Sequence, residues 1–86
     1  MPVQSIRVFD AGINYDLAER FIVEFDRRYI YGLSIDCHMP NGYCQFLGER
    51  KEFDFCELVK GRVILKWNDI PDNVKRQIAF IKKTFD

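Results

Sequence analysis

The sequence predicts a small α+β domain: a meander-like antiparallel sheet of four to five strands packed in two layers with two amphipathic helices. Short segments alternate apolar and polar residues, as strands do. Two longer segments, residues 16–29 and the residues after Pro71, place apolar side chains on one helical face. The pair Asn41-Gly42 lies between two alternating segments, which is a strong hairpin signal. The 86 residues suffice for one core, so a single domain over 1–86 in the order β-α-β-β-β-β-α is expected.

The first two elements are predicted to be a strand and a helix. Residues 3–9 (VQSIRVF) alternate in character and predict the strand. Asn14 is a favourable N-cap, the segment Asp16–Tyr29 follows the helical period, and Gly32 is expected to end the helix. The arginines at 27–28 are interpreted as the solvated end of this helix. The buried arc of the predicted helix comprises Leu17, Ala18, Phe21, Ile22, Phe25 and Tyr29.

The next two strands are predicted to form a tight hairpin around Asn41-Gly42. A two-residue type I′ turn there pairs Pro40 with Tyr43 and Met39 with Cys44. Side chains along a strand alternate between the two faces of the sheet. The predicted apolar face carries Ile35, Cys37, Met39, Cys44 and Phe46. The opposite face carries Asp36, His38, Tyr43, Gln45 and Leu47.

Two cysteines and the only histidine lie within the segment CHMPNGYC, residues 37–44, which raises the question of a metal site. In a regular strand His38 points away from Cys37, so the two side chains cannot bind one metal ion. Zinc sites also need a second pair of ligands at matching spacing, which the sequence does not contain. We therefore expect no metal and no other cofactor. The three cysteines, 37, 44 and 56, are expected to be small buried apolar residues.

Residues 50–67 admit two interpretations. The favoured one is a second hairpin around residues 59–62, because apolar residues keep a period of two on both sides of the turn. It places Cys56, Leu58, Val63, Leu65 and Trp67 on one inward face. The alternative is a helix over residues 50–60 that ends at Gly61, followed by a strand over 62–67. That alternative gives a ferredoxin-like order, βαββαβ, with an additional C-terminal helix.

The C-terminal helix carries the clearest pattern in the chain. Asn68 or Asp69 can cap it, and Pro71 suits its first turn. Its apolar stripe consists of Val74, Ile78, Ile81 and Phe85, with Ile70 just before it. Its basic residues, Lys75, Arg76, Lys82 and Lys83, turn away from that stripe. Phe80 projects roughly opposite the stripe, so either the first helix covers it or it contacts another chain.

Composition and motifs speak against several classes of function. Thirteen basic residues balance thirteen acidic ones, so the net charge gives no general attraction to nucleic acid. Gly12 stands alone, without the glycine spacing and lysine of a phosphate-binding loop. No segment approaches the about 18–20 apolar residues of a membrane helix. The N-terminal residues do not resemble a signal peptide. The lack of resemblance to a signal peptide, together with the odd number of cysteines, predicts reduced thiols and a cytoplasmic location.

The sequence therefore predicts a non-enzymatic protein-binding or regulatory module, of the adaptor or inhibitor type that mobile elements and phages encode. Thirteen aromatic residues (eight Phe, four Tyr and one Trp) exceed what one small core must bury, and surface aromatics are common anchors. The expected partner is another protein or a second copy of the chain. The predicted contact residues are Phe80, Arg76, Lys83, Lys75, His38, Tyr43 and Gln45.

Two other functions remain open at the level of the sequence. The first is nucleic-acid binding through the basic face of the C-terminal helix. The second is a small enzyme that uses Asp36 and His38, which lie two residues apart on one predicted strand face. An exposed polar strand face explains the same pair more simply.

Overall fold

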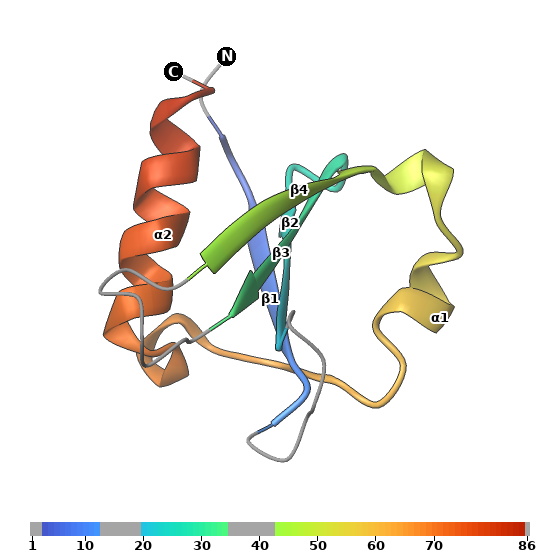
Figure 1. Cartoon of the computed structure of the whole chain (residues 1–86), viewed down its shortest axis with the longest axis horizontal. Coiled ribbons are helices and arrows are strands. Elements are labelled where there is room, and N and C mark those ends of the chain that lie inside the picture. The colour runs from blue at the N-terminus through green and yellow to red at the C-terminus, as the bar shows by residue number, and fades with distance from the viewer. Residues whose placement is uncertain (1–2, 13–19, 35–42, 86) are drawn as a thin grey trace.

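The computed structural model describes residues 3–12, 20–34 and 43–85. Within these ranges the chain forms a five-stranded antiparallel sheet, one long helix, one short helix and two 3-10 turns (Figure 1). The strands are β1 (Ile6–Asp10), β2 (Phe21–Phe25), β3 (Tyr29–Ser34), β4 (Tyr43–Glu49) and β5 (Val63–Ile64). The helices are α1 (Phe55–Leu58) and α2 (Asp72–Lys83), and the 3-10 turns are Arg50–Glu52 and Trp67–Asp69. The predicted α+β class is confirmed.

The sheet is a meander of four strands with the short fifth strand returning to its first edge. The strand order is β4-β3-β2-β1-β5, and every described neighbouring pair is antiparallel. In the register, Val23 of the central strand pairs with Val8 on one side and Tyr31 on the other. Tyr31 in turn pairs with Phe46 of β4. Because paired residues share a face, these four side chains lie on one side of the sheet.

Both faces of the sheet carry a core, and Figure 1 shows α2 and α1 on opposite sides of it. The larger core lies under α2 and contains Val8, Phe21, Val23, Phe25, Leu33, Ile70, Val74, Ile78 and Ile81. The smaller core contains Phe9, Ile22 and Ile30. Apolar residues of the segment 53–59 pack against this smaller core. The sheet is therefore sandwiched between a long helix and a shorter, irregular segment.

The predicted first helix is wrong, because most of its described residues form β2 and the start of β3. All five residues of β2 are buried. A central strand covered on both faces needs consecutive apolar residues. Three of these in β2, Phe21, Ile22 and Phe25, also fall within one 100° arc of a helical wheel. Gly32, the predicted end of the helix, lies inside β3. Residues 13–19, with the predicted cap Asn14, lie outside the described residues.

The predicted register of the hairpin is also wrong. Tyr43 pairs with Ser34 rather than Pro40, and Cys44 pairs with Leu33 rather than Met39. The turn residues 35–42 lie outside the described residues. Cys44 and Phe46 do share a face, as predicted, but both are exposed. The inward placement of Cys44 is wrong because β4 is the edge strand of the sheet.

The favoured second hairpin does not form. Residues 55–58 are helical, Gly61 adopts a positive φ of 80°, and Val63–Ile64 pair with β1. The helical alternative thus describes the local structure better, although the ferredoxin-like order fails because β2 replaces the first helix. Cys56 is exposed, contrary to its predicted burial.

The C-terminal helix is confirmed. Val74, Ile78 and Ile81 are at most 3% exposed, and Pro71 immediately precedes the first helical residue. The proposed caps Asn68 and Asp69 belong instead to the 3-10 turn that leads into the helix.

Candidate partner-binding surface

Phe80 of α2 lies outside the buried stripe of its helix, as the sequence predicts. Its side chain is 69% exposed, whereas Ile78, two residues earlier, is 1% exposed. A phenylalanine that is not covered by its own chain exposes a large apolar area among polar neighbours. Phe80 is therefore the starting point for a candidate binding surface.

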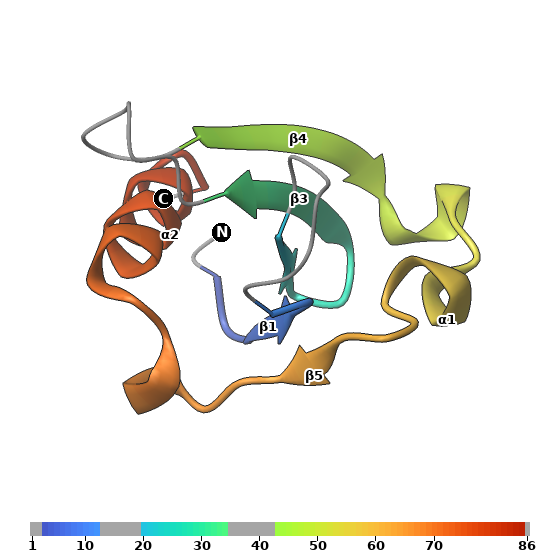
Figure 2. The ribbon, with the colours of Figure 1, turned by 60° about the horizontal axis from the view of Figure 1, so that its bottom comes forward.

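Two contacts orient the flanks of α2. Gln77 Nε2 donates a hydrogen bond of 3.3 Å to the carbonyl oxygen of Ser34, at the end of β3. Lys75 Nζ lies 5.5 Å from the ring centroid of Trp67, in the segment that follows β5. On a helix of 3.6 residues per turn, Phe80 is about 60° from Gln77 and about 140° from Lys75. Phe80 therefore lies on the flank of α2 nearer β3 and β4. Figure 2 shows β4 at the edge of the sheet opposite β5.

Phe46 of β4 adds a second exposed aromatic residue on the same side of the sheet. Its side chain is 50% exposed, and its ring lies 5.1 Å from Tyr31 and 6.5 Å from Tyr29, centroid to centroid. Tyr29 in turn lies 5.1 Å from Phe85, the aromatic residue just after α2. Burial raises the pKa of the Tyr31 phenol. A continuous row of rings therefore leads from the edge strand to the end of the helix.

We call the group of Phe46, Phe80, Tyr29, Tyr31 and Phe85 the aromatic surface. The first two residues are exposed. The other three are partly buried, and their rings contact Phe46 or one another. The surface thus consists of three partly buried aromatic side chains and two exposed ones. Aromatic residues in such settings contribute strongly to protein association because they bury a large area with few rotatable bonds.

The predicted contact residues do not all belong to this surface. Arg76 and Lys83 are exposed and lie within about 60° of Phe80 around the helix axis. Lys75 lies on the other flank, beside Trp67. Gln45 is exposed but alternates with Phe46 along β4, so it faces the opposite side of the sheet.

Three further predicted positions cannot be placed on a surface. Tyr43 is the first residue of β4, and His38 and Asp36 lie outside the described residues. The predicted catalytic pair Asp36–His38 and the metal-free state of Cys37 and His38 therefore stay predictions.

A second exposed apolar group lies at the other edge of the sheet, and the sequence interpretation missed it. Val63, Ile64 and Trp67 are 63%, 59% and 52% exposed. The predicted inward placement of Val63 and Trp67 is wrong, because β5 is an edge strand of two residues and no described element covers its side chains. The alternation of apolar residues predicts a strand here, but it does not indicate that the strand lies at the edge of the sheet.

Within residues 3–12, 20–34 and 43–85, no three His, Cys, Asp or Glu side chains are grouped so that they could hold a metal ion. No helix in these ranges has the length and apolar character needed to cross a membrane. Comparison of the chain with protein-family models, with curated proteins and with solved structures finds no match.

Proposed function

We propose that the protein is a binding module that contacts another protein through the aromatic surface. The observation that carries this proposal is the exposure of two large aromatic side chains, Phe46 and Phe80, on the same side of the sheet. Apolar anchors of this kind stabilise a complex when a partner removes them from water. The proposal includes the cytoplasmic location that the sequence predicts.

The charges around the aromatic surface favour a partner that combines apolar and acidic side chains. Arg76 and Lys83 lie beside Phe80 on the exposed face of α2. At the other end of the surface, the guanidinium carbon of Arg28 lies 5.1 Å from the ring centroid of Tyr29. Cations at both ends of an apolar surface attract carboxylates and steer the approach of an acidic partner.

The same charges make a second copy of the chain a weaker candidate. In a symmetric dimer centred on Phe80, each residue meets the region around the same residue of the other copy. Arg76 and Lys83 would then face their own counterparts, and like charges brought together at an interface oppose association. A different protein with complementary charge is the partner that we propose.

The proposal is tested by selecting displayed peptides on the immobilised 86-residue protein and measuring their affinities by fluorescence anisotropy. We expect the selected peptides to combine aromatic or aliphatic residues with Asp and Glu. The double variant Phe46→Ala, Phe80→Ala should weaken their binding by about 30-fold or more, as expected for the loss of an anchor worth about 2 kcal/mol. Its thermal midpoint should change little, because both side chains are exposed.

Trp67→Ala is the matched control, because Trp67 is an exposed aromatic residue at the opposite edge of the sheet. This variant should bind the selected peptides as the unchanged protein does. Peptides that bind the double variant undiminished, or that lose their affinity with Trp67→Ala, would contradict the proposal. A labelled single-stranded oligonucleotide, titrated in the same assay at two salt concentrations, tests the nucleic-acid alternative.

A further inference from the structure

A basic cleft lies at the end of the β2–β3 hairpin. It has a volume of about 210 Å³ and is lined by Arg27, Arg28, Glu49, Arg50 and Lys51. The chain as a whole carries equal numbers of acidic and basic residues, yet four of the five lining side chains are basic. The cleft is therefore a local concentration of positive charge in a neutral protein.

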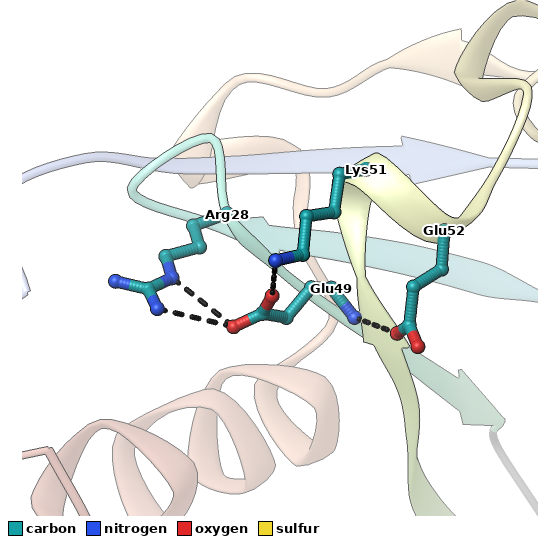
Figure 3. A network of polar contacts seen from close by, with 4 residues as sticks. All are labelled: Arg28, Glu49, Lys51 and Glu52. Atoms are coloured by element: carbon teal, nitrogen blue, oxygen red, sulfur yellow. Dashed lines mark hydrogen bonds and ion pairs between the residues drawn. The ribbon is translucent and has the colours of Figure 1, made fainter.

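Two of these cations converge on one carboxylate, as Figure 3 shows. Arg28 donates to Oε1 of Glu49 from Nε at 3.2 Å and from Nη2 at 3.1 Å, and Lys51 Nζ lies 3.2 Å from Oε2. Lys51 and Arg28 together hold the pKa of Glu49 below its usual range. The backbone N–H of Glu49 donates to Glu52 at 2.6 Å, which fixes the residue at the end of β4. The Glu49 carboxylate thus occupies a position where the surrounding cations favour an anion.

The conformation of Arg27 is unusual for its residue type. Asp26 and Arg27 both adopt the left-handed region, with φ of 54° and 56°. For Asp26 the structure gives a reason, since its Oδ1 accepts hydrogen bonds from the amides of Gln4 and Ser5 at 2.8 and 2.9 Å. Arg27 is exposed and makes no side-chain hydrogen bond or ion pair within the described residues. Arg28 N–H donates to the carbonyl oxygen of Phe25 at 3.0 Å, so Asp26 and Arg27 are the central residues of the β2–β3 turn, where two positive φ values are expected. The turn thus places an unpaired cation among the residues that line the cleft.

Arg50 lines the cleft, and contacts with residues outside the cleft restrain its side chain. Its amide donates to the carbonyl of Arg28 at 2.7 Å, which joins the two sides of the cleft. Its Nε lies 3.7 Å from Oε2 of the buried Glu24, and its guanidinium carbon lies 4.6 Å from the ring centroid of Phe55. These contacts limit the freedom of the guanidinium before any ligand arrives, which reduces the entropy lost on binding.

We propose that this cleft binds a phosphoryl group, with Glu49 as the internal carboxylate that the ligand displaces. Several guanidinium and ammonium groups around one cleft suit a dianion with tetrahedral oxygens better than a single carboxylate. Glu49 keeps Arg28 and Lys51 oriented in the free protein. The inference does not depend on the aromatic surface, because none of the residues that line the cleft belongs to it.

The test is a titration of the ¹⁵N-labelled protein with sodium phosphate, followed by amide chemical shifts at ionic strength held constant with sodium chloride. We expect saturable shifts centred on residues 27, 28 and 49–51. Arg27→Asn should weaken phosphate binding about threefold or more, because it removes a cation while asparagine tolerates the left-handed conformation. Glu49→Gln should strengthen binding about fivefold, because it removes the competing charge.

The double variant Lys60→Ala, Lys66→Ala is the matched control, since it removes two exposed cations outside the cleft and should leave phosphate affinity unchanged. A peptide with one phosphoserine, compared with its unphosphorylated form, identifies the source of the phosphoryl group. Tighter binding than inorganic phosphate assigns the site to a phosphorylated protein, and equal binding assigns it to the free anion. Linear shifts without saturation, shifts as large at Lys60 and Lys66, or weaker binding by Glu49→Gln would overturn the proposal. Phe46→Ala, Phe80→Ala should not affect this titration, so the two proposals fail separately.

Discussion

Glu24 is a buried carboxylate at the centre of the sheet, only 1% exposed. Its Oε1 accepts a hydrogen bond of 2.7 Å from Arg7 Nε, and Arg50 approaches its Oε2 at 3.7 Å. The hydrogen bond from Arg7 to Glu24 raises the pKa of the guanidinium. The guanidinium carbon of Arg7 also lies 5.4 and 5.5 Å from the ring centroids of Phe9 and Phe55. The charge of Glu24 is thus tolerated inside the protein because Arg7 lies against it.

Arg7→Met should destabilise the protein strongly. It leaves the buried carboxylate of Glu24 with Arg50 alone, and breaking a buried ion pair from one side costs about 3–5 kcal/mol. Arg28→Met is the matched control, because its ion pair with Glu49 is largely exposed and should contribute less than about 1 kcal/mol. Urea unfolding of both variants gives the two free energies, and equal losses would show that Glu24 does not depend on Arg7.

Asp10 and Arg20 form a second partly buried pair, with Arg20 Nε 2.7 Å from Oδ1 of Asp10. Burial pushes the pKa of Asp10 upward, but hydrogen bonds from Arg20 and from the amide of Gly12 outweigh it and lower the pKa. The folded pKa lies below the unfolded value of about 3.9, so the stabilisation is fully present above that pH. It is lost as the pH falls from there through the folded pKa.

Asp10→Asn should therefore reduce stability at neutral pH by about 1–3 kcal/mol, the usual value of hydrogen bonds to charged groups. The difference between the variant and the unchanged protein should shrink as the pH falls below about 4. Thermal melts from pH 2 to 7 measure this difference. A difference that stays constant over the whole range would mean that the charge of Asp10 contributes nothing.

Strand β4 is shaped by one glycine. The register between β3 and β4 shifts between Ile30 and Tyr31, and Gly48 at this irregularity has φ of 143° and is buried. A Cβ added at Gly48 would collide with the Glu52 carboxylate and touch the Phe53 ring at 3.3 Å. Both the backbone conformation and the space at this position therefore require glycine.

Gly48→Ala should lose about 2–3 kcal/mol of stability, because it adds backbone strain and displaces Glu52 from the amide of Glu49. Gly61→Ala is the matched control, since Gly61 also has a positive φ but has open space around its Cα. That control should lose only about 1 kcal/mol. Denaturant unfolding of the two variants compares them, and an equal loss would assign the whole effect at Gly48 to the backbone.

The elements differ in how well the sequence predicts them. Helix α2 has one buried and one solvated side, so its stripe of Val74, Ile78 and Ile81 identifies both its type and its orientation. Strand β2 is buried on both faces and is apolar except for Glu24, so it shows no alternation of apolar and polar residues that would mark it as a strand. The edge position of β4 and β5 depends on the order of strands in the sheet. The local sequence pattern therefore could not predict that Cys44, Val63 and Trp67 are exposed.

At the scale of the whole molecule, the sheet separates two exposed apolar groups. Phe46 and Phe80 lie on the side of the β4 edge, and Val63, Ile64 and Trp67 lie along the β5 edge. The position of Phe80 away from the buried stripe was predictable from the helical wheel, whereas its exposure was not, since a second helix could have covered it. Its location on the same side of the sheet as Phe46 was also not predictable, because that depends on which flank of α2 faces β4.

The basic cleft also arises only in the folded chain. The β2–β3 turn supplies Arg27 and Arg28, and the end of β4 with the following 3-10 turn supplies Glu49, Arg50 and Lys51. From the sequence, the two arginines are placed at a solvated helix end, because a helix is predicted over residues 16–29, where the structure has β2, the turn and the start of β3. Arg28 over the Tyr29 ring then links the cleft to the aromatic surface.

We propose that the aromatic surface, rather than the apolar group at the β5 edge, contacts the partner. The most direct test of this proposal is a chemical-shift map of the ¹⁵N-labelled protein saturated with the tightest peptide from the selection. We expect the largest shifts to cluster at residues 29, 31, 46, 80 and 85, with residues 63, 64 and 67 unchanged. Largest shifts at residues 63, 64 and 67 would contradict the proposal.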